Sequence, residues 1–316
     1  MAYFAGVDVG WIYAKAVILN EKAIASRQMV LSRGNYDNVG NDVLTKALEE
    51  AGISLDEVVG VAMTGHRAAN VPKAKEKVSE IVCTSRGVFH QIPSARTIIE
   101  VSGQSQKVIT INEEGKPVDF FENQRCATGT YNCEICGAAS NRYLHQVAVV
   151  LDVKEEDLGE LSLKATSPVK YDTSACAVAA RSEVRTWLAN GASKEDIIAG
   201  VHAAAAVRIA AMLTRSGVHK DVVVTGGGAK DAGLIKAIEE RLGTKVLIPE
   251  HPEYSGALGA VLVARDAAQV AQVKDEKSEE ERQREITRLR EERRRERERL
   301  INETIERERK MRRALW

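Results

Sequence analysis

The 316-residue sequence predicts an α/β protein with two related βββαβα-type domains and a charged C-terminal helix. Three observations support this fold class. A strand, a polar glycine turn and a second strand occur near the start of the chain and again from residue 97. A buried strand leads into three glycines at residues 226–228, and after residue 268 the composition changes abruptly to Lys, Glu and Arg. We therefore expect domains at residues 1–96, 97–268 and 269–316, with a ligand cleft between the first two.

The first predicted domain opens with a β-hairpin. Apolar runs at residues 4–9 and 14–19 predict two strands joined by a turn at residues 10–13. Apolar residues at helical spacing then predict a helix over residues 42–51, which ends at a glycine. A further strand is expected at residues 58–63, and it leads into residues 64–66.

The second predicted domain repeats the hairpin. Strands at residues 97–101 and 107–111 flank a glycine turn, and Glu114 and Gly115 form the next hairpin turn. Residues 221–225 form a buried strand that runs into the triple glycine and a helix start, an arrangement that suits phosphate binding. The remaining helices are predicted at residues 142–150, 182–189, 194–214 and 233–242.

Charge and cysteine usage exclude several classes of protein. The net charge of zero gives no electrostatic footprint for nucleic acid, and no run approaches the ~18 apolar residues of a membrane span. The start of the chain lacks a secretory leader, so we expect a cytoplasmic protein. Five cysteines are an odd number in a long chain, which favours thiols or metal ligands over a disulfide framework.

Three glycine turns with polar neighbours predict an ATP site. Asp8 precedes Gly10 and is suited to place a carboxylate near Mg²⁺, with Lys15 as a positive partner. An ordinary hairpin turn is the alternative here and at the second turn. Three glycines between a strand and a helix cost conformational entropy on folding, which is expected only where a ligand must approach the backbone closely. The residues of the second and third turns are Ser102, Gly103, Gln104, Gly226, Gly227 and Gly228.

Residues 3–265 resemble one branch of the actin-like ATPases, the family of 2-hydroxyacyl-CoA dehydratase activators and benzoyl-CoA reductase ATPase subunits. The family motif Cys-Ala-Ala-Gly-Thr-Gly is similar to residues 126–130, and Cys-Thr-Val-Phe-Ala-Glu-Ser-Glu is similar to residues 176–183. Thr-Gly-Gly-Val-Ala-x-Asn resembles residues 225–231, and Asn-Gly-Ala-Leu-Gly-Ala resembles residues 255–260. The resemblance implies two actin-like (ribonuclease H-like) ATPase domains with ATP and Mg²⁺ in the cleft.

The resemblance also implies roles for single residues. The expected catalytic residues are Asp8, Glu100 and Gln104. The expected nucleotide-binding residues are Gly10, Lys15, Ser102, Gly103, Gln104, Gly129, Thr130, Gly226, Gly227, Gly228, Lys230 and Gly256.

Two cysteines are implied as metal ligands by the same resemblance. Cys126 and Cys176 would give two of the four thiolates of a 4Fe-4S cluster shared with a sister ATPase subunit. Cys133 and Cys136 follow closely, and three interpretations stay open: structural or free thiols, additional or substitute cluster ligands, or a dithiol switch. Cys83 is expected in the hydrophobic core.

Both phosphate turns depart from the family pattern. The family's Gly-Ser-Thr-x-x-Lys is replaced by Gly10 and the apolar segment of residues 11–14, so hydroxyl groups that would meet phosphate are missing. In the family's Asp-Ile-Gly-Gly-Gln-Asp-x-Lys, the acidic positions hold Glu100 and Ser105 here. Hydrolysis by this chain is therefore expected to be slow or altered if either aspartate orients the attacking water.

We expect an ATP-dependent, electron-activating subunit of a benzoyl-CoA reductase-like complex, with larger catalytic subunits and a ferredoxin-type electron donor. The alternatives are a homodimeric activator of a 2-hydroxyacyl-CoA dehydratase, a sugar-type kinase, and a non-hydrolysing regulatory subunit. For the charged tail, alternating Glu and Arg favour a solvated helix with i,i+4 pairs, and a docking arm is the alternative.

Overall fold

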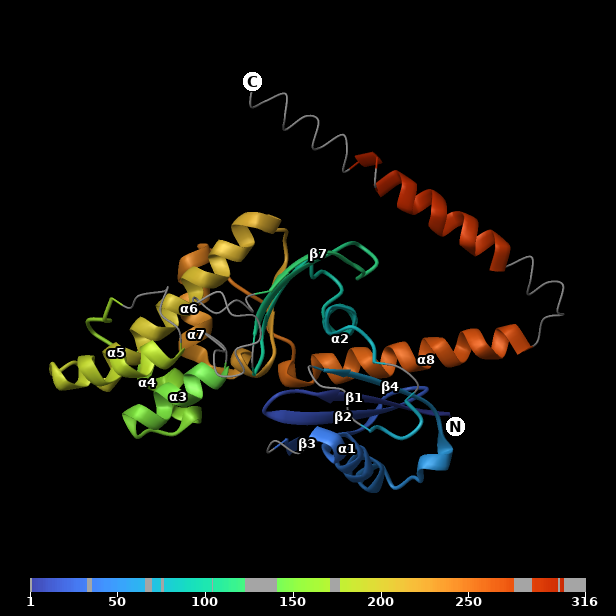
Figure 1. The fold of residues 1–316 in the computed structure, drawn as a ribbon, viewed down its shortest axis with the longest axis horizontal. Helices are drawn as coiled ribbons and strands as arrows, with labels where there is room; N and C mark the ends of the chain where they lie inside the picture. Colours follow the sequence, from blue (N-terminus) through green and yellow to red (C-terminus); the bar gives the residue numbers. More distant parts are fainter. Residues whose placement is uncertain are drawn as a thin grey trace. The chain divides into compact units, whose positions relative to one another are not determined.

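The computed structural model describes residues 2–32, 36–65, 70–74, 77–103, 105–122, 141–170, 177–275, 286–300 and 302–303 (Figure 1). The chain divides into two compact units, Met1–Arg265 and Asp266–Trp316. The larger unit holds two four-stranded sheets with the strand orders β3-β2-β1-β4 and β7-β6-β5-β8. In each sheet three strands are antiparallel and the fourth is parallel to the first. This repeated topology confirms the predicted α/β class, while the domain boundaries at residues 96 and 268 stay a prediction.

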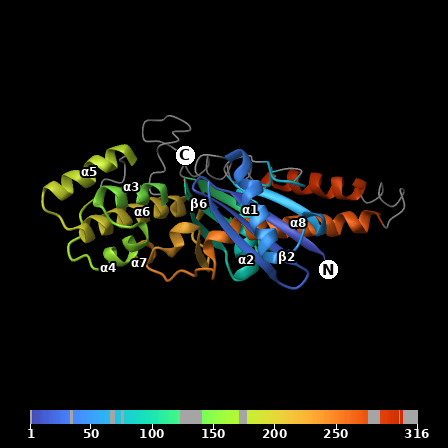
Figure 2. The same cartoon turned by 90° about the horizontal axis from the view of Figure 1, so that it is seen from below.

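The first sheet contains the predicted hairpin. Its strands are β1 (Tyr3–Val9), β2 (Tyr13–Asn20), β3 (Ile24–Leu31) and β4 (Val58–Gly65). Helix α1 (Tyr36–Ala51) lies along one face of this sheet (Figures 1 and 2). Its residues Val43, Leu44 and Ala47 are buried in one hydrophobic cluster with β1 and β2. The strand β3 was not predicted from the sequence.

The second sheet is formed by β5 (Thr97–Val101), β6 (Gln106–Ile111), β7 (Pro117–Glu122) and β8 (Val222–Thr225). All residues of β6 are buried, which places this strand in the centre of the core. The helices that follow β7 are α3 (Asn141–Leu151), α4 (Leu158–Leu163), α5 (Ala177–Ala189), α6 (Lys194–Ser216) and α7 (Ala232–Leu242).

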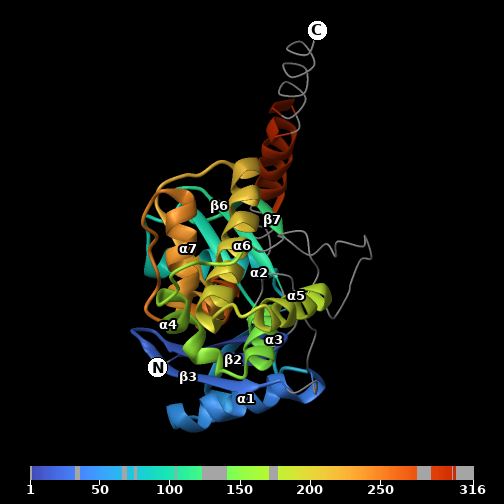
Figure 3. The same cartoon turned by 90° about the vertical axis from the view of Figure 1, so that its left-hand side faces the viewer.

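Helices α6 and α7 lie side by side on the second sheet (Figure 3). The residues Ile197, Ile198 and Ile209 of α6 are buried in one cluster with strands β5, β6 and β8. Within the described part of the chain, α6 is long and apolar enough to span a membrane by length and composition alone. Its most apolar stretch is 61% buried inside the molecule, as in the core helix of a globular domain.

Two helices pack between the sheets, α2 (Glu80–Gln91) and the first part of α8 (Ser255–Asp275). Val88 of α2 joins a core cluster of the second sheet, whereas α8 contacts the first sheet at Gly6. A Cβ atom on Gly259 would lie 1.7 Å from the carbonyl oxygen of Cys83, so the two helix backbones touch. Cys83 is fully buried at this crossing, which confirms its predicted place in the core.

The second unit contains a charged helix over residues 286–300. Its side chains from residue 287 to residue 300 are exposed. Arg288 pairs with Glu292, and Arg294 pairs with Glu298, both at i,i+4 spacing. These features agree with a solvated helix stabilised by its own ion pairs.

Candidate nucleotide-binding site

One cavity of about 460 Å³ is lined by residues of both sheets, and its volume suits a small-molecule ligand. It brings together many of the residues that the sequence predicts for the ATP site. These are Asp8, Gly10, Lys15, Glu100, Ser102, Gly103, Gly226, Gly227, Gly228, Lys230 and Gly256. The predictions for Gln104, Gly129 and Thr130 fall outside the described residues.

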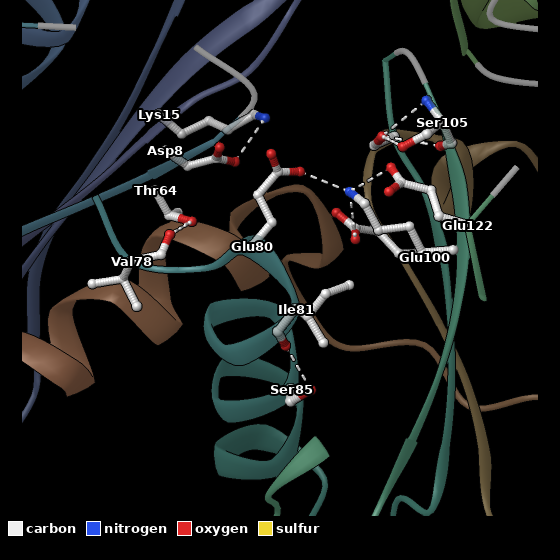
Figure 4. Close-up of polar contacts among 12 residues, drawn as sticks. Asp8, Lys15, Thr64, Val78, Glu80, Ile81, Ser85, Glu100, Ser105 and Glu122 are labelled. Atoms are coloured by element: carbon white, nitrogen blue, oxygen red, sulfur yellow. Dashed lines mark hydrogen bonds and ion pairs between the residues drawn. The ribbon is translucent and has the colours of Figure 1, made fainter. Parts of the chain in front are cut away.

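The first turn of the cavity carries an acid–lysine pair on neighbouring strands. Asp8 of β1 and Lys15 of β2 stand opposite each other in the antiparallel register, and Lys15 Nζ donates to Asp8 Oδ2 at 3.2 Å (Figure 4). The start of α8 lies against the same carboxylate, because a Cβ atom on Gly256 would come within 3.1 Å of Asp8 Oδ2. Glycine at this position therefore leaves room for Asp8 at the cavity wall.

The second turn repeats this pair in the other sheet. Glu100 of β5 and Lys107 of β6 also stand opposite each other, and Lys107 Nζ donates to Glu100 Oε2 at 3.3 Å. Beyond them the turn is closed by Ser102, whose N–H and hydroxyl both donate to the carbonyl of Ser105 at 3.0 Å. The two sheets thus carry matching acid–lysine pairs and matching turns, and Asp8, Lys15 and Glu100 of these pairs line one cavity.

Lys107 also holds two carboxylates that the sequence did not single out. Its Nζ lies 2.7 Å from Glu80 Oε2 and 3.9 Å from Glu122 Oε1, and its side chain is only 3% exposed (Figure 4). Burial alone would lower the pKa of Lys107, but Glu100, Glu80 and Glu122 outweigh it and raise the pKa. Burial raises the pKa of Glu100, and the neighbouring Glu80 and Asp8 add to this, while Lys107 opposes it. The lysine therefore stays charged among its acidic partners.

Glu80 was missed because its helix was missed. It lines the cavity from the first turn of α2, directly after the N-cap residue Ser79. A serine followed by an acidic residue is a helix-start signal, and it was available in the sequence.

The third turn needs glycine for steric reasons. Gly226 has a φ of 84°, and a Cβ atom there would lie 2.4 Å from the carbonyl oxygen of Val101. Its N–H donates to the carbonyl of Pro252 at 3.0 Å, and the hydroxyl of Thr225 donates to the same carbonyl at 2.9 Å. The end of β8 is thereby fixed next to the end of β5, with the glycines facing the cavity.

Behind the third turn lies a buried polar chain that sequence reasoning also missed. Asp231 caps α7 by accepting from Leu234 N at 2.9 Å, and its Oδ2 lies 3.1 Å from Nε2 of His202. The fully buried His202 places Nδ1 3.0 Å from the hydroxyl of Ser162. Burial raises the pKa of Asp231, but His202 and the N–H groups of Leu234 and Gly233 outweigh it and hold that pKa below its usual value. A lone histidine in an apolar helix gives no sequence signal for such a partner.

The described cysteine does not suit a metal. Burial raises the pKa of Cys83 to about 12, which keeps the thiol protonated at neutral pH, whereas cluster ligands are thiolates. The predicted ligands Cys126 and Cys176, and also Cys133 and Cys136, lie outside the described residues. Among the residues that are described, no group of three His, Cys, Asp or Glu side chains is arranged to hold a metal ion.

Most of the chain matches a known protein family. The model of the BadF/BadG/BcrA/BcrD ATPase family matches residues 5–264. The activator of lactoyl-CoA dehydratase from Anaerotignum propionicum is 37% identical over 267 residues, which are 84% of this chain and 99% of the relative. A benzoyl-CoA reductase subunit from Thauera aromatica is 28% identical over 273 residues, 83% of this chain and 93% of the relative.

A solved structure agrees with these sequence matches. The activator of the 2-hydroxyisocaproyl-CoA dehydratase from Clostridium difficile, with bound ADPNP, superposes with a TM-score of 0.78 at 33% identity. The superposition covers 87% of this chain and 98% of that chain. The matches confirm the resemblance carried by the sequence motifs. The family match ends at residue 264, so the charged tail lies beyond it.

Proposed function

Because the chain belongs to the BadF/BadG/BcrA/BcrD ATPase family, we propose that it is the ATP-dependent activator of a 2-hydroxyacyl-CoA dehydratase. The observation that carries this proposal is the cavity that is lined by Asp8, Lys15 and Glu100 and by the triple-glycine turn. The activator relatives are more similar to this chain than the reductase relative is. The benzoyl-CoA reductase role that we expected from the sequence is therefore the second candidate.

The residues of the cavity suit a nucleotide with Mg²⁺. Asp8 supplies one carboxylate at the cavity wall for a Mg²⁺ ion that arrives with the phosphate groups, and Lys15 supplies positive charge for a phosphate group. The glycines at residues 226–228 let a ligand approach the backbone without meeting a Cβ atom. Phosphoryl transfer depends mainly on such positioning and charge, so this chain would supply the ATPase part of the activator.

The electron-transfer part of the proposal rests on Cys126 and Cys176. Two thiolates per chain complete a 4Fe-4S cluster only with a second subunit, so the active form would be a dimer or a pair of sister subunits. When bound, such a cluster supplies a one-electron carrier that a ferredoxin-type protein reduces. We propose that ATP use by this chain drives the transfer of that electron to the dehydratase in the cytoplasm.

Anaerobic purification tests the proposal. We expect about two iron atoms per chain, because one cluster of four would serve two chains. Cys126→Ala and Cys176→Ala should lose the iron and its reduced-state paramagnetic signal, with Cys133→Ala as the matched control that keeps both. An iron-free wild type that phosphorylates a sugar would instead support a kinase. Loss of iron in Cys133→Ala but not in Cys176→Ala would contradict the ligand assignment.

The second candidate, an ATPase subunit of a benzoyl-CoA reductase-like complex, is favoured by the altered phosphate turns. A sister subunit that hydrolyses most of the ATP would tolerate the apolar residues 11–14 and the changes at Glu100 and Ser105. Co-purification with a sister ATPase and larger subunits, and reduction of an aromatic acyl-CoA, would support it. A stable homodimer that activates a separate dehydratase would exclude it.

A further inference from the structure

The two phosphate turns meet through one apolar side chain. A Cβ atom on Gly103 would lie 3.2 Å from Cγ1 and 3.3 Å from Cδ1 of Ile12, so this side chain packs directly on Gly103. Ile12 belongs to the turn between β1 and β2, and Gly103 belongs to the turn between β5 and β6. Both residues line the cavity. The contact therefore joins the turns of the two sheets at the cavity.

Backbone hydrogen bonds hold Ile12 in this position. The N–H of Gly10 donates to the carbonyl of Tyr13 at 3.1 Å, which closes the turn. The buried Ser32 clamps the same turn from the end of β3, because its N–H donates to the carbonyl of Ile12 at 2.8 Å and its hydroxyl donates to the carbonyl of Gly10. These bonds fix the backbone of Ile12 to the first sheet, so a change in the spacing of the two turns moves Ile12 relative to Gly103.

An isoleucine at this point changes what the cavity accepts. In a nucleotide whose phosphate chain extends from the glycines at residues 226–228 toward the two turns, the outermost group would lie nearest to Ile12. That group would lose water there, and a hydrocarbon side chain offers no hydrogen bond in return. A diphosphate has one phosphate group fewer to bring between the turns.

We propose that Ile12 is a specificity-determining residue that disfavours a terminal phosphate between the two turns. The chain then binds a nucleoside triphosphate less tightly, relative to the diphosphate, than it would with a hydroxyl-bearing residue at this position. This inference rests on the proposed nucleotide site. A triphosphate must separate Ile12 from Gly103 to bind fully, so the contact couples nucleotide state to the spacing of the two turns.

Calorimetric titration with Mg-ADP and with a non-hydrolysable Mg-ATP analogue tests the proposal on the full chain. Ile12→Thr keeps the branched shape and adds a hydroxyl. We expect this variant to lower the Kd of the analogue, relative to the Kd of ADP, about tenfold, or ~1.4 kcal/mol. Ile12→Val shortens the side chain and should give a smaller change in the same direction. Leu31→Thr is the matched control, because Leu31 lies on β3, is 44% exposed and is not among the residues that line the cavity, and it should leave the ratio unchanged.

The ratio of the two affinities separates a specific effect from a general one. Damage to the fold would weaken the binding of both nucleotides together and leave the ratio of their affinities unchanged. An unchanged ratio in both Ile12→Thr and Ile12→Val, with both nucleotides still bound, would overturn the role of Ile12 and leave the proposed function intact. A wild type that binds neither nucleotide would overturn the proposed nucleotide site, and this inference with it.

Discussion

At the residue scale, the site depends on a buried lysine with more acidic partners than its own charge can balance. Lys107 contacts Glu80, Glu100 and Glu122, which come from α2, β5 and β7. Removing one partner of a buried ionic network leaves uncompensated charge, which is strongly destabilising. The network therefore fixes the second turn and α2 to each other at the cavity wall.

Lys107→Met should lower the free energy of unfolding at neutral pH by about 3–5 kcal/mol, because three carboxylates then lie together without a cation. Urea unfolding measures this loss. The control is Lys245→Met, which removes an exposed ion pair with Glu239 and should cost less than about 1 kcal/mol. Equal losses of unfolding free energy in the two variants would contradict a stabilising role of the buried network. At pH values where the carboxylates bind protons, the loss in Lys107→Met should shrink.

Asp231 gives a prediction about pH. Its pKa is lowered in the folded protein, so its ionised form contributes stability that is present above its unfolded pKa and is lost as pH falls through its folded pKa. Asp231→Asn should therefore destabilise the protein at pH 7, by about 1 kcal/mol, and much less near pH 3. Because asparagine is also a good N-cap, Asp231→Ala should cost roughly 1 kcal/mol more. A pH-independent loss in Asp231→Asn would show that charge is not the cause.

At the element scale, the sequence predicted those elements whose apolar residues show a clear period. The first hairpin, β4 and the helices α6 and α7 were found in this way. The strand β3 was missed because its centre, Ser26 to Gln28, is polar. Helix α2 was missed because most of its buried residues are small or polar, among them Thr84, Ser85 and Gly87. Gly87 lies against the backbone of Ser255, and a scale of apolar character does not detect that kind of packing.

The crossing of α2 and α8 yields a prediction at the same scale. Gly259→Ala places a methyl group 1.7 Å from the carbonyl oxygen of Cys83, so the helices must separate. We expect a loss of at least about 3 kcal/mol in the free energy of unfolding, although alanine favours a helix over glycine. Gly52→Ala is the comparison: it strains a residue with φ of 68° but meets no atom within 4 Å, and should cost about 1 kcal/mol. A smaller loss for Gly259→Ala than for Gly52→Ala would argue against this crossing.

At the scale of the whole molecule, the site is assembled from turns that are far apart in the sequence. Their glycines and the side chains of Asp8, Lys15 and Glu100 were singled out from the sequence, and these residues line one cavity. The partners of Lys107 were not predictable, because Glu80 and Glu122 reach it only through the packing of α2 and β7. The contact of Ile12 with Gly103 likewise depends on how the two sheets face each other.

The charged tail should be dispensable for nucleotide binding. The residues that line the cavity lie between Asp8 and Gly256, and the family match ends at residue 264. A chain that ends after residue 275 should bind Mg-ADP within about twofold of the full-length protein by calorimetry. Loss of binding with an intact fold, judged by circular dichroism, would mean that the tail contributes to the site.

The crossing of α2 and α8 has a mechanical consequence. Gly87 lies against the backbone of Ser255, and Gly259 lies against that of Cys83, so main chain meets main chain with few side chains between them. Helix α2 contacts strands of both sheets, whereas α8 packs on the first sheet at Gly6. We expect this crossing to act as a pivot, with the sheets rotating about it when the cleft widens. Spin labels on the two helices would then report a change of angle with little change in their separation.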